Sequence, residues 1–195
     1  MCGISGILSW SELPDRKILE KMNNSLTHRG PDAQGIHIEG ALGLAHRRLS
    51  VIDLAETSNQ PMADVTGQYW ITYNGEIYNY KIIRKELEVI GAHFKTKSDT
   101  EVLLEAYKQW GLECLDRFNG MFAFALWDGP CRRLILARDR LGKKPLFYYK
   151  LPRGGLIFAS ELKALLEDPR VPRKLNMDAL GQYLSFGYAV GEESM

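Results

Sequence analysis

The chain begins with MCGISGILS, residues 1–9, which places a thiol directly behind the initiator methionine. The apolar run from Gly3 to Ser9 predicts a β-strand. If Met1 is removed, the side chain of Cys2 and a free α-amino group belong to one residue. An α-amino group has an ordinary pKa of about 7.7–8.0, so it can act as a neutral base near physiological pH. This arrangement is typical of N-terminal nucleophiles, in which the nucleophile carries its own base.

Taken alone, a cysteine in second position is more often a small apolar side chain without chemistry. The other two cysteines, Cys114 and Cys131, form no CxxC pair with each other or with Cys2. No histidine stands at a metal-ligand spacing from them, so we expect no metal site. An odd number of cysteines in a chain of this size fits a reducing compartment. The role of Cys2 therefore depends on the rest of the sequence.

Composition narrows the class of protein. The 195 residues are 45% hydrophobic and 25% charged, which is typical of a soluble globular chain. Lys plus Arg is 25 and Asp plus Glu is 24, so no basic excess indicates a nucleic-acid partner. The longest apolar run, from Met121 to Trp127, is too short to cross a membrane, and no apolar signal follows a basic start. We expect a cytoplasmic protein with no membrane or nucleic-acid partner.

Local patterns predict helices between and after β-strands. A strand from Gln68 to Tyr73 is expected to stop at Asn74-Gly75, a strong turn signal. Ser98 and Glu101 have the spacing of a capping box at the start of a helix. Two hairpins are expected, with strands at 121–127 and 132–138 around a turn at 128–130, and at 145–149 and 155–159. Helices are expected to begin at Pro14, to cover 79–90 and 98–110, and to begin again at Ser160 and near Asp178. This order favours an α+β fold with mostly antiparallel sheets.

Eight different short sequence motifs follow one another along the chain. They are Cys2-Gly3-Ile4, HRGPD at 28–32, HRRLSVID at 46–53, NGEIYN at 74–79, SDTE at 98–101, GMFAFA at 120–125, RDRLG at 138–142 and ASELKA at 159–164. Together they resemble class II glutamine amidotransferases, which are N-terminal-nucleophile hydrolases, and the last three are similar to asparagine synthetases. The resemblance implies a four-layer αββα sandwich of two mostly antiparallel sheets.

The resemblance also implies a role for each matched residue. Cys2 would attack the side-chain amide of L-glutamine and form a thioester, provided that Met1 has been removed. Asn74 and the backbone N–H of Gly75 would form the oxyanion hole, where preorganised donors lower the barrier. The remaining matched residues would bind the substrate: Arg48 the carboxylate, Asp99 with Glu76 the ammonium, and Val51 and Ile52 through their backbone.

Several of these residues have ordinary alternative roles. Asn74-Gly75 fits a plain hairpin turn, Asp99 could serve only its helix N-terminus, and Arg48 could form a surface salt bridge. Arg47 stands next to Arg48, so the choice between them rests on the motif. The histidines of the matched blocks, His28 and His46, are expected to make structural hydrogen bonds.

The resemblance finally implies what lies outside these 195 residues. We expect residues 1–195 to be a single glutaminase domain, a fragment that lacks a C-terminal ATP-dependent synthetase domain. That domain would be its partner and would use the ammonia to make asparagine from aspartate. No Gly-rich phosphate loop occurs here, so ATP and magnesium are expected only in the missing domain, and no cofactor or metal in this one. A homodimer is left open.

Two other functions stay open. The chain could serve an amidotransferase that aminates another acceptor, such as a sugar or a small acid in a biosynthetic cluster. It could also be a catalytically silent remnant that binds a ligand or partner domain. The presence of Cys2, Arg48, Asn74, Gly75 and Asp99 together argues against a remnant, since binding alone gives no chemical reason to keep all five.

Overall fold

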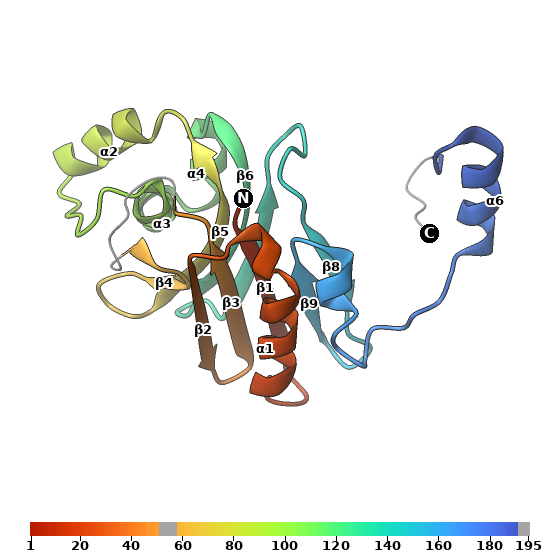
Figure 1. Ribbon diagram of the computed structural model, residues 1–195. Coiled ribbons are helices and arrows are strands. Elements are labelled where there is room, and N and C mark those ends of the chain that lie inside the picture. Colours follow the sequence, from red (N-terminus) through yellow and green to blue (C-terminus); the bar gives the residue numbers. More distant parts are fainter. Residues whose placement is uncertain (51–57, 191–195) are drawn as a thin grey trace.

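Two antiparallel sheets lie face to face in the computed structural model, which describes residues 1–50 and 58–190 (Figure 1). The first sheet has the order β2-β3-β1-β9-β8 and the second the order β4-β5-β6-β7. The strands of the first sheet are β1 (Gly3–Ser9), β2 (Ala33–Glu39), β3 (Leu42–Arg48), β8 (Phe147–Lys150) and β9 (Gly155–Ala159). Those of the second are β4 (Met62–Ala63), β5 (Tyr69–Ile77), β6 (Gly120–Asp128) and β7 (Arg133–Arg138).

Helices cover the outer faces of both sheets. The helices are α1 (Arg16–Ser25), α2 (Tyr80–Val89), α3 (Asp99–Trp110), α4 (Cys114–Arg117), α5 (Leu162–Leu165) and α6 (Met177–Phe186), with 3-10 turns at Thr27–Arg29 and Gly111–Glu113. Helices α1 and α5 lie on the first sheet, while α2 and α3 lie on the second (Figure 1).

Three apolar layers hold the sandwich together. The layer between the sheets includes Ile4, Leu44 and Phe158 from the first sheet and Ala123 and Trp127 from the second. A second layer packs α1 and α5 against the first sheet, and a third packs α2 and α3 against the other sheet. The expected four-layer αββα sandwich is confirmed.

The structure confirms most of the predicted elements and moves some of their ends. Both hairpins form, as β6–β7 and β8–β9. Helix α1 begins at Arg16 rather than at Pro14, because the side chain of Asp15 accepts a 2.7 Å hydrogen bond from the N–H of Lys17 and caps the helix there. The helix expected from Ser160 is only the short α5, from Leu162 to Leu165.

Only one of the two hydrogen bonds of a capping box forms at the start of α3. The hydroxyl of Ser98 accepts the N–H of Glu101 at 3.3 Å, as expected of an N-cap. The carboxylate of Glu101 does not return to Ser98. It accepts instead from the N–H groups of Lys95 and Thr96 at 2.8 and 2.7 Å, so it ties the preceding loop to the helix.

The prediction that a strand stops at Asn74-Gly75 is wrong. Strand β5 runs through both residues to Ile77 and stays paired with β6. Gly75 has no positive φ, which an Asn-Gly hairpin turn would require. A Cβ on Gly75 would lie 2.4 Å from the carbonyl oxygen of Met121 and 2.7 Å from the Cα of Phe122. The glycine therefore permits a close approach of two backbones.

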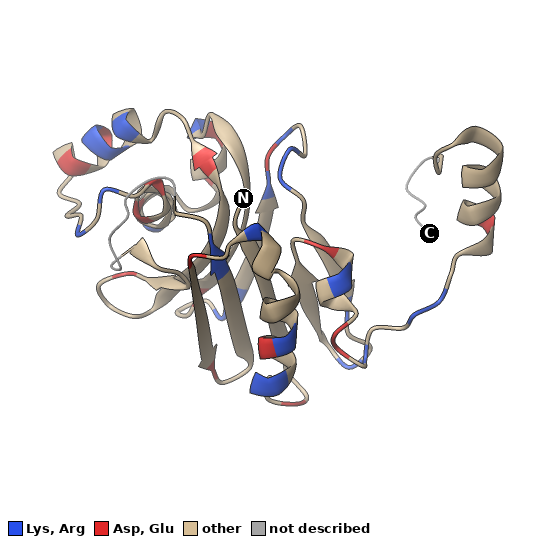
Figure 2. Ribbon diagram, in the orientation of Figure 1, with Lys and Arg blue, Asp and Glu red and all other residues tan. Residues whose placement is uncertain are grey.

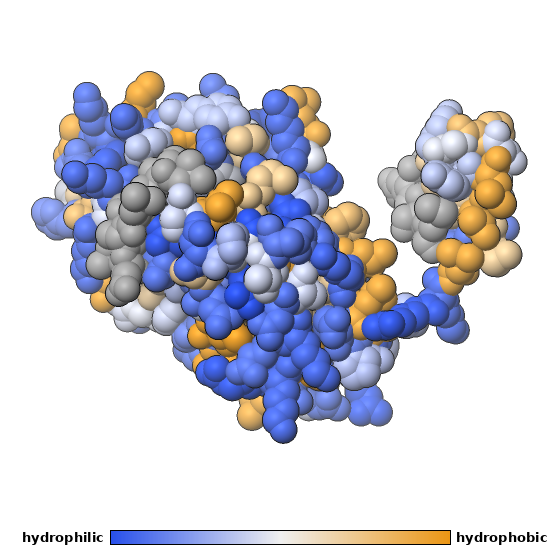
Figure 3. Space-filling model, viewed as in Figure 1, coloured by the Kyte–Doolittle hydropathy of each residue, from blue (hydrophilic) through white to orange (hydrophobic). Residues whose placement is uncertain are grey.

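Charged residues and exposed apolar residues are distributed differently over the molecule. Acidic and basic residues are interspersed along the ribbon of the sandwich (Figure 2). Helix α6 lies apart from the sandwich at the end of an extended segment and carries exposed apolar residues, including Leu184 and Phe186 (Figures 1 and 3). Within the described ranges, none of the helices has the length and apolar character needed to cross a bilayer.

Candidate active site

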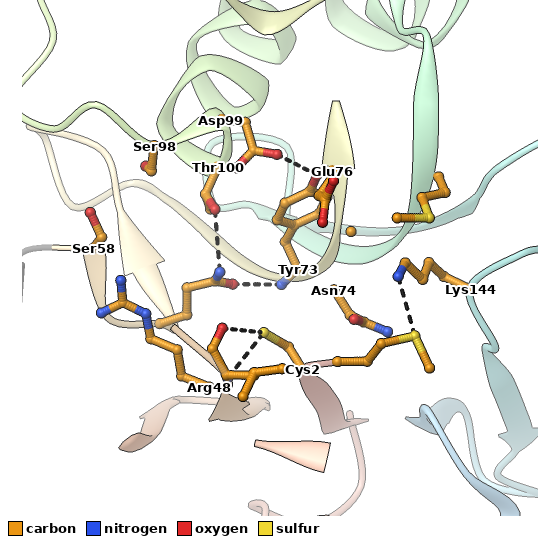
Figure 4. Close-up of a pocket in the computed structure, with 15 residues that line it drawn as sticks. Cys2, Arg48, Ser58, Tyr73, Asn74, Glu76, Ser98, Asp99, Thr100 and Lys144 are labelled. Carbon is orange, nitrogen blue, oxygen red and sulfur yellow. Dashed lines mark hydrogen bonds between the residues drawn. The ribbon is translucent and has the colours of Figure 1, made fainter. Parts of the chain in front are cut away.

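A pocket of about 380 Å³ opens where β1, β3, β5 and α3 meet. Six of the eight residues predicted from the sequence line it (Figure 4). Cys2 directly precedes β1, Arg48 ends β3, Asn74 to Glu76 lie on β5, and Asp99 begins α3. The other two predicted residues, Val51 and Ile52, lie outside the described residues.

The thiol of Cys2 lies against the backbone of the segment after β3. Its Sγ is 3.4 Å from the N–H of Leu49, which donates to it, and 3.7 Å from the carbonyl oxygen of the same residue. Burial raises the pKa of the thiol above its ordinary value. The N–H of Leu49, the chain's amino terminus and the cations Arg48 and Lys144 act in the opposite direction. The thiol therefore needs a base to take its proton near neutral pH.

The side-chain amide of Asn74 has an unsatisfied donor. The residue is 1% exposed, and its Nδ2 has no hydrogen-bond partner in the part of the chain that the structure describes. A buried donor without a partner costs about 1–3 kcal/mol, so such groups are rare in native structures. The sandwich holds this donor in the pocket beside Cys2 (Figure 4).

The backbone N–H of Gly75 also faces the pocket, as strand pairing shows. Gly129 donates to the carbonyl of Gln68 at 3.0 Å, and Tyr78 donates to Asn119 at 2.8 Å. These two hydrogen bonds lie at the two ends of the pairing of β5 with β6. In an antiparallel pair, hydrogen-bonded and non-hydrogen-bonded residue pairs alternate along the strands. Even-numbered residues of β5 thus bond to β6, and the N–H of Gly75 points away from it.

The neighbours of Gly75 on that edge are held by side chains. The N–H of Tyr73 donates to Oε1 of Gln60 at 2.6 Å, and the N–H of Ile77 donates to Oδ2 of Asp99 at 3.0 Å. The N–H of Gly75 lies between these two, in the wall of the pocket. Together with Nδ2 of Asn74, it provides two donors on the same strand, which suits a developing oxyanion.

A carboxylate and a guanidinium lie in the same pocket. Asp99 is almost fully buried, and its Oδ2 accepts the hydroxyl of Tyr73 at 2.7 Å. Burial raises the pKa of Asp99, and the hydrogen bonds from Ile77 and Tyr73 offset part of that effect. Arg48 is also buried, and Oδ1 of Asn59 accepts its guanidinium at 2.6 Å.

The adjacent arginine points elsewhere. The guanidinium of Arg47 donates to the carbonyl of Asn23 at 3.1 Å and contacts Oδ1 of Asn24, both on helix α1. Strand alternation places consecutive side chains on opposite faces. Arg48 is therefore the residue of this pair that reaches the pocket.

Comparison with known proteins is consistent with this geometry. The sequence matches the family described as glutamine amidotransferase domain over residues 1–195. The chain belongs to this family. It is 40% identical over 191 residues to asparagine synthetase (glutamine-hydrolyzing) 3 of Bacillus subtilis, covering 96% of this chain and 31% of that protein. It is 37% identical over 212 residues to a putative asparagine synthetase (glutamine-hydrolyzing) 2 of Methanocaldococcus jannaschii, covering 96% of this chain and 40% of that protein.

The amidotransferase domain also has a relative among solved structures. It superposes on glutamine phosphoribosylpyrophosphate amidotransferase from B. subtilis, complexed with ADP and GMP, with a TM-score of 0.71 and 24% identity. The match covers 84% of this chain and 43% of that one, and it shows that the two share a fold. The chain spans about a third of the length of the asparagine synthetases described above.

Sequence reasoning missed several side chains of the amidotransferase pocket, among them those of three polar residues. Gln60, Tyr73 and Lys144 all line it. Tyr73 directly precedes Asn74, yet its side chain lies on the opposite face of β5, toward α3. Only the position of α3 brings Asp99 to it. Nothing in the local sequence shows that Lys144, rather than the adjacent Lys143, is the buried lysine.

The histidine at position 46 connects the two sheets. Its Nε2 donates to the carbonyl oxygen of Tyr73 at 3.1 Å. Complete burial lowers the pKa of His46 to about 4, so its ring is neutral at physiological pH. This contact is the structural hydrogen bond that the sequence predicted for His46. His28 lies at Glu161, with 2.9 Å between Nε2 and Oε1.

Proposed function

We propose that this domain hydrolyses the side-chain amide of L-glutamine to glutamate and ammonia through a thioester on Cys2. The observation that carries the proposal is the buried Nδ2 of Asn74, a donor without a partner in the described structure, in the same pocket as the thiol. An electrophile that becomes an oxyanion beside Cys2 would give this donor its missing acceptor.

The substrate's two charged groups have complementary partners. Arg48 would bind the α-carboxylate, since a guanidinium can hold both carboxylate oxygens. Asp99 would bind the α-ammonium, with Glu76 adding negative charge. These groups fix one end of glutamine, so that its amide carbon reaches Sγ of Cys2. Val51 and Ile52 remain proposed contacts of the substrate.

The reaction would proceed in two steps that share the same donors. The α-amino group of processed Cys2 takes the thiol proton, and Sγ attacks the amide carbon. Asn74 and Gly75 hold the resulting oxyanion while the amine returns the proton to the leaving nitrogen, and ammonia departs. Water then attacks the thioester through a second oxyanion, and glutamate leaves with the thiol restored.

Met1 must be removed before this chemistry can begin. In the chain as described, the Cys2 nitrogen is an amide and cannot act as a base. Met1 also lines the pocket, and Lys144 Nζ lies 3.3 Å from its Sδ.

The relatives support a role within a longer protein. The similar curated proteins are named as glutamine-hydrolysing asparagine synthetases, and the match covers only 31–40% of their length. We infer that residues 1–195 form one domain and supply ammonia to a cytoplasmic synthetase partner. That partner would bind ATP, magnesium and aspartate, while this domain needs no cofactor. The names of the relatives favour asparagine over another aminated product.

The test is a glutaminase assay on chain whose processed N-terminus has been verified by intact mass. We expect glutamate release by the native chain, loss of about 10⁴-fold or more for Cys2→Ala, and no loss for Cys131→Ala. Cys131 is an exposed cysteine outside the pocket and serves as the matched control. Undiminished hydrolysis by folded Cys2→Ala would remove the nucleophile and with it the proposal.

A further inference from the structure

A buried ammonium lies in the pocket without an established role. Lys144 is 5% exposed and lines the pocket together with Cys2. Buried lysines are normally paired with a carboxylate. Across residues 1–50 and 58–190 no such ion pair is present for Lys144, and its Nζ contacts Sδ of Met1 at 3.3 Å.

The backbone of Lys144 is held firmly. Oδ1 of Asp139 accepts the N–H of Lys143 at 2.9 Å, and Oδ2 accepts the N–H of Lys144 at 3.0 Å. Nε of Arg138 donates to the carbonyl of Lys144 at 2.7 Å. These hydrogen bonds fix the backbone of the loop between β7 and β8, and this loop holds the ammonium of Lys144 in the pocket.

Removal of Met1 changes the surroundings of this ammonium. The thioether that contacts Nζ is lost, and the nitrogen of Cys2 becomes a free amine. Met1 is bonded directly to that nitrogen and its Sδ contacts Nζ of Lys144, so the ammonium and the new amine both border the space that the Met1 side chain occupies in the pocket. Arg48 and Lys144 lie on opposite sides of Cys2 (Figure 4).

We propose that Lys144 is a positioning residue that keeps the α-amino group of processed Cys2 unprotonated near neutral pH. The inference rests on the proposed function, in which this amine takes the proton of the thiol. An isolated α-amino group, with a pKa of about 7.7–8.0, is unprotonated in only a minority of molecules at pH 7, and only that fraction can act as a base. A nearby cation disfavours the protonated form of an amine, because two positive charges repel each other.

Other charged groups of the pocket and of its supporting loops also act on the amine. They are Arg48 from β3, Glu76 from β5, Asp99 from α3, Asp139 beneath the Lys144 loop, and Arg29, whose Nε donates to the carbonyl of Cys2 at 3.0 Å. The carboxylate of Glu76 favours a protonated amine, and so does that of Asp99. Lys144 opposes them from the side of Met1. Loss of its charge would therefore leave the amine protonated to a higher pH.

The first test is the pH dependence of kcat/KM for glutamine, measured on Met1-cleaved chain. We expect the acidic limb to move up by about one pH unit in Lys144→Met. Activity at pH 7 would then fall about 5-fold and recover at pH 8.5. Lys144→Arg, which keeps the charge, should retain the native profile. Lys144→Gln is a second neutral variant, and thermal unfolding verifies that each variant is folded.

Two results would overturn the proposal. One is an acidic limb in the neutral variants that coincides with that of the native chain. The other is a loss of equal size at every pH, which would indicate packing or oxyanion stabilisation instead.

A second test does not depend on glutaminase activity. The α-amine is titrated in Cys2→Ala, with and without Lys144→Met, by the pH dependence of its acetylation, and the N-terminal peptide is quantified by mass spectrometry. We expect the midpoint to be about one unit higher without the lysine, and equal midpoints would refute its role. If the native chain does not hydrolyse glutamine, the proposed function fails, while this titration still decides on Lys144.

Discussion

The hydroxyl of Tyr73 donates a 2.7 Å hydrogen bond to Oδ2 of Asp99, across the interface between β5 and α3. The same oxygen accepts the N–H of Ile77 at 3.0 Å. These two donors orient a buried carboxylate that opens onto the pocket. The binding site proposed for the substrate ammonium is thus built by a strand and a helix that are separated by a second helix in the sequence.

Replacement of Tyr73 by Phe should weaken glutamine binding. The change removes a hydrogen bond to a charged group, which contributes about 1.5–3 kcal/mol. We expect KM for glutamine to rise about 10-fold, with kcat within about 3-fold of the native value. Steady-state kinetics give both numbers. Tyr69→Phe, on the same strand but outside the pocket, is the control, and equal KM values in the two variants would contradict the assigned role.

Replacement of Asp99 by Asn should separate stability from binding. Burial raises the pKa of Asp99 in the folded chain above its ordinary value of 3.8, so the folded chain binds this proton more tightly than the unfolded chain. Its stabilising contribution is complete below pH 3.8 and is lost as the pH rises through the folded pKa. We therefore expect Asp99→Asn to be at least as stable as the native chain at pH 7, with this advantage shrinking toward pH 4.

Urea unfolding between pH 4 and pH 7 checks the stability of Asp99→Asn, and kinetics check its binding. KM for glutamine should rise about 30-fold or more, because the substrate ammonium loses its ionised partner. Asp116→Asn changes an exposed carboxylate and should do neither. A stability difference that stays constant across this pH range would show that burial does not raise the pKa of Asp99 in the folded chain.

Replacement of Asn74 by Ala should affect catalysis far more than stability. Its Nδ2 has no partner within the described ranges, so folding loses no hydrogen bond from that donor. We expect kcat to fall about 10²–10³-fold, the size seen when an oxyanion donor is removed. Asn79→Ala is the opposite case. The side-chain amide of Asn79 donates to the carbonyl of Arg117 and accepts the N–H of Asn119. Asn79→Ala should therefore lose about 1 kcal/mol of stability and keep the native kcat.

Replacement of Gly75 by Ala should destabilise the sandwich. The added Cβ would lie 2.4 Å from the carbonyl oxygen of Met121, and backbone can give way only if β5 and β6 separate. We expect a loss of about 1–3 kcal/mol, read from chemical unfolding. The control is Gly181→Ala, where nothing lies within 4 Å of the added atom and no loss is expected. Equal stability of the two variants would disprove the close approach at Gly75.

Retention of Met1 should abolish glutamine hydrolysis. Chain produced with methionine aminopeptidase inhibited should be inactive, because its Cys2 nitrogen is an amide and its Met1 lines the pocket. Treatment with purified aminopeptidase should restore activity in step with the loss of the methionine mass. Full activity of the uncleaved chain would show that the amine is not the base.

Local sequence patterns and short motifs were enough to predict the fold class and to select most residues of the proposed site. Alternating apolar residues predicted the hairpins β6–β7 and β8–β9 because side chains on a strand alternate between two faces. The matched blocks selected Cys2, Arg48, Asn74, Gly75, Glu76 and Asp99, and one pocket contains them all. The structure confirms the hairpins and brings the selected residues to one pocket, while their catalytic and binding roles stay predictions.

The contacts among these residues depend on how the sheets and helices pack together. Asn74-Gly75 has the local preference of a turn, yet pairing with β6 keeps it extended. The partners of Asp99 and the burial of Lys144 depend on elements far apart in the sequence, namely β5 with α3 and the β7–β8 loop with the chain's start. Contacts of this kind arise when two sheets pack face to face, and no local pattern encodes which side chains then meet.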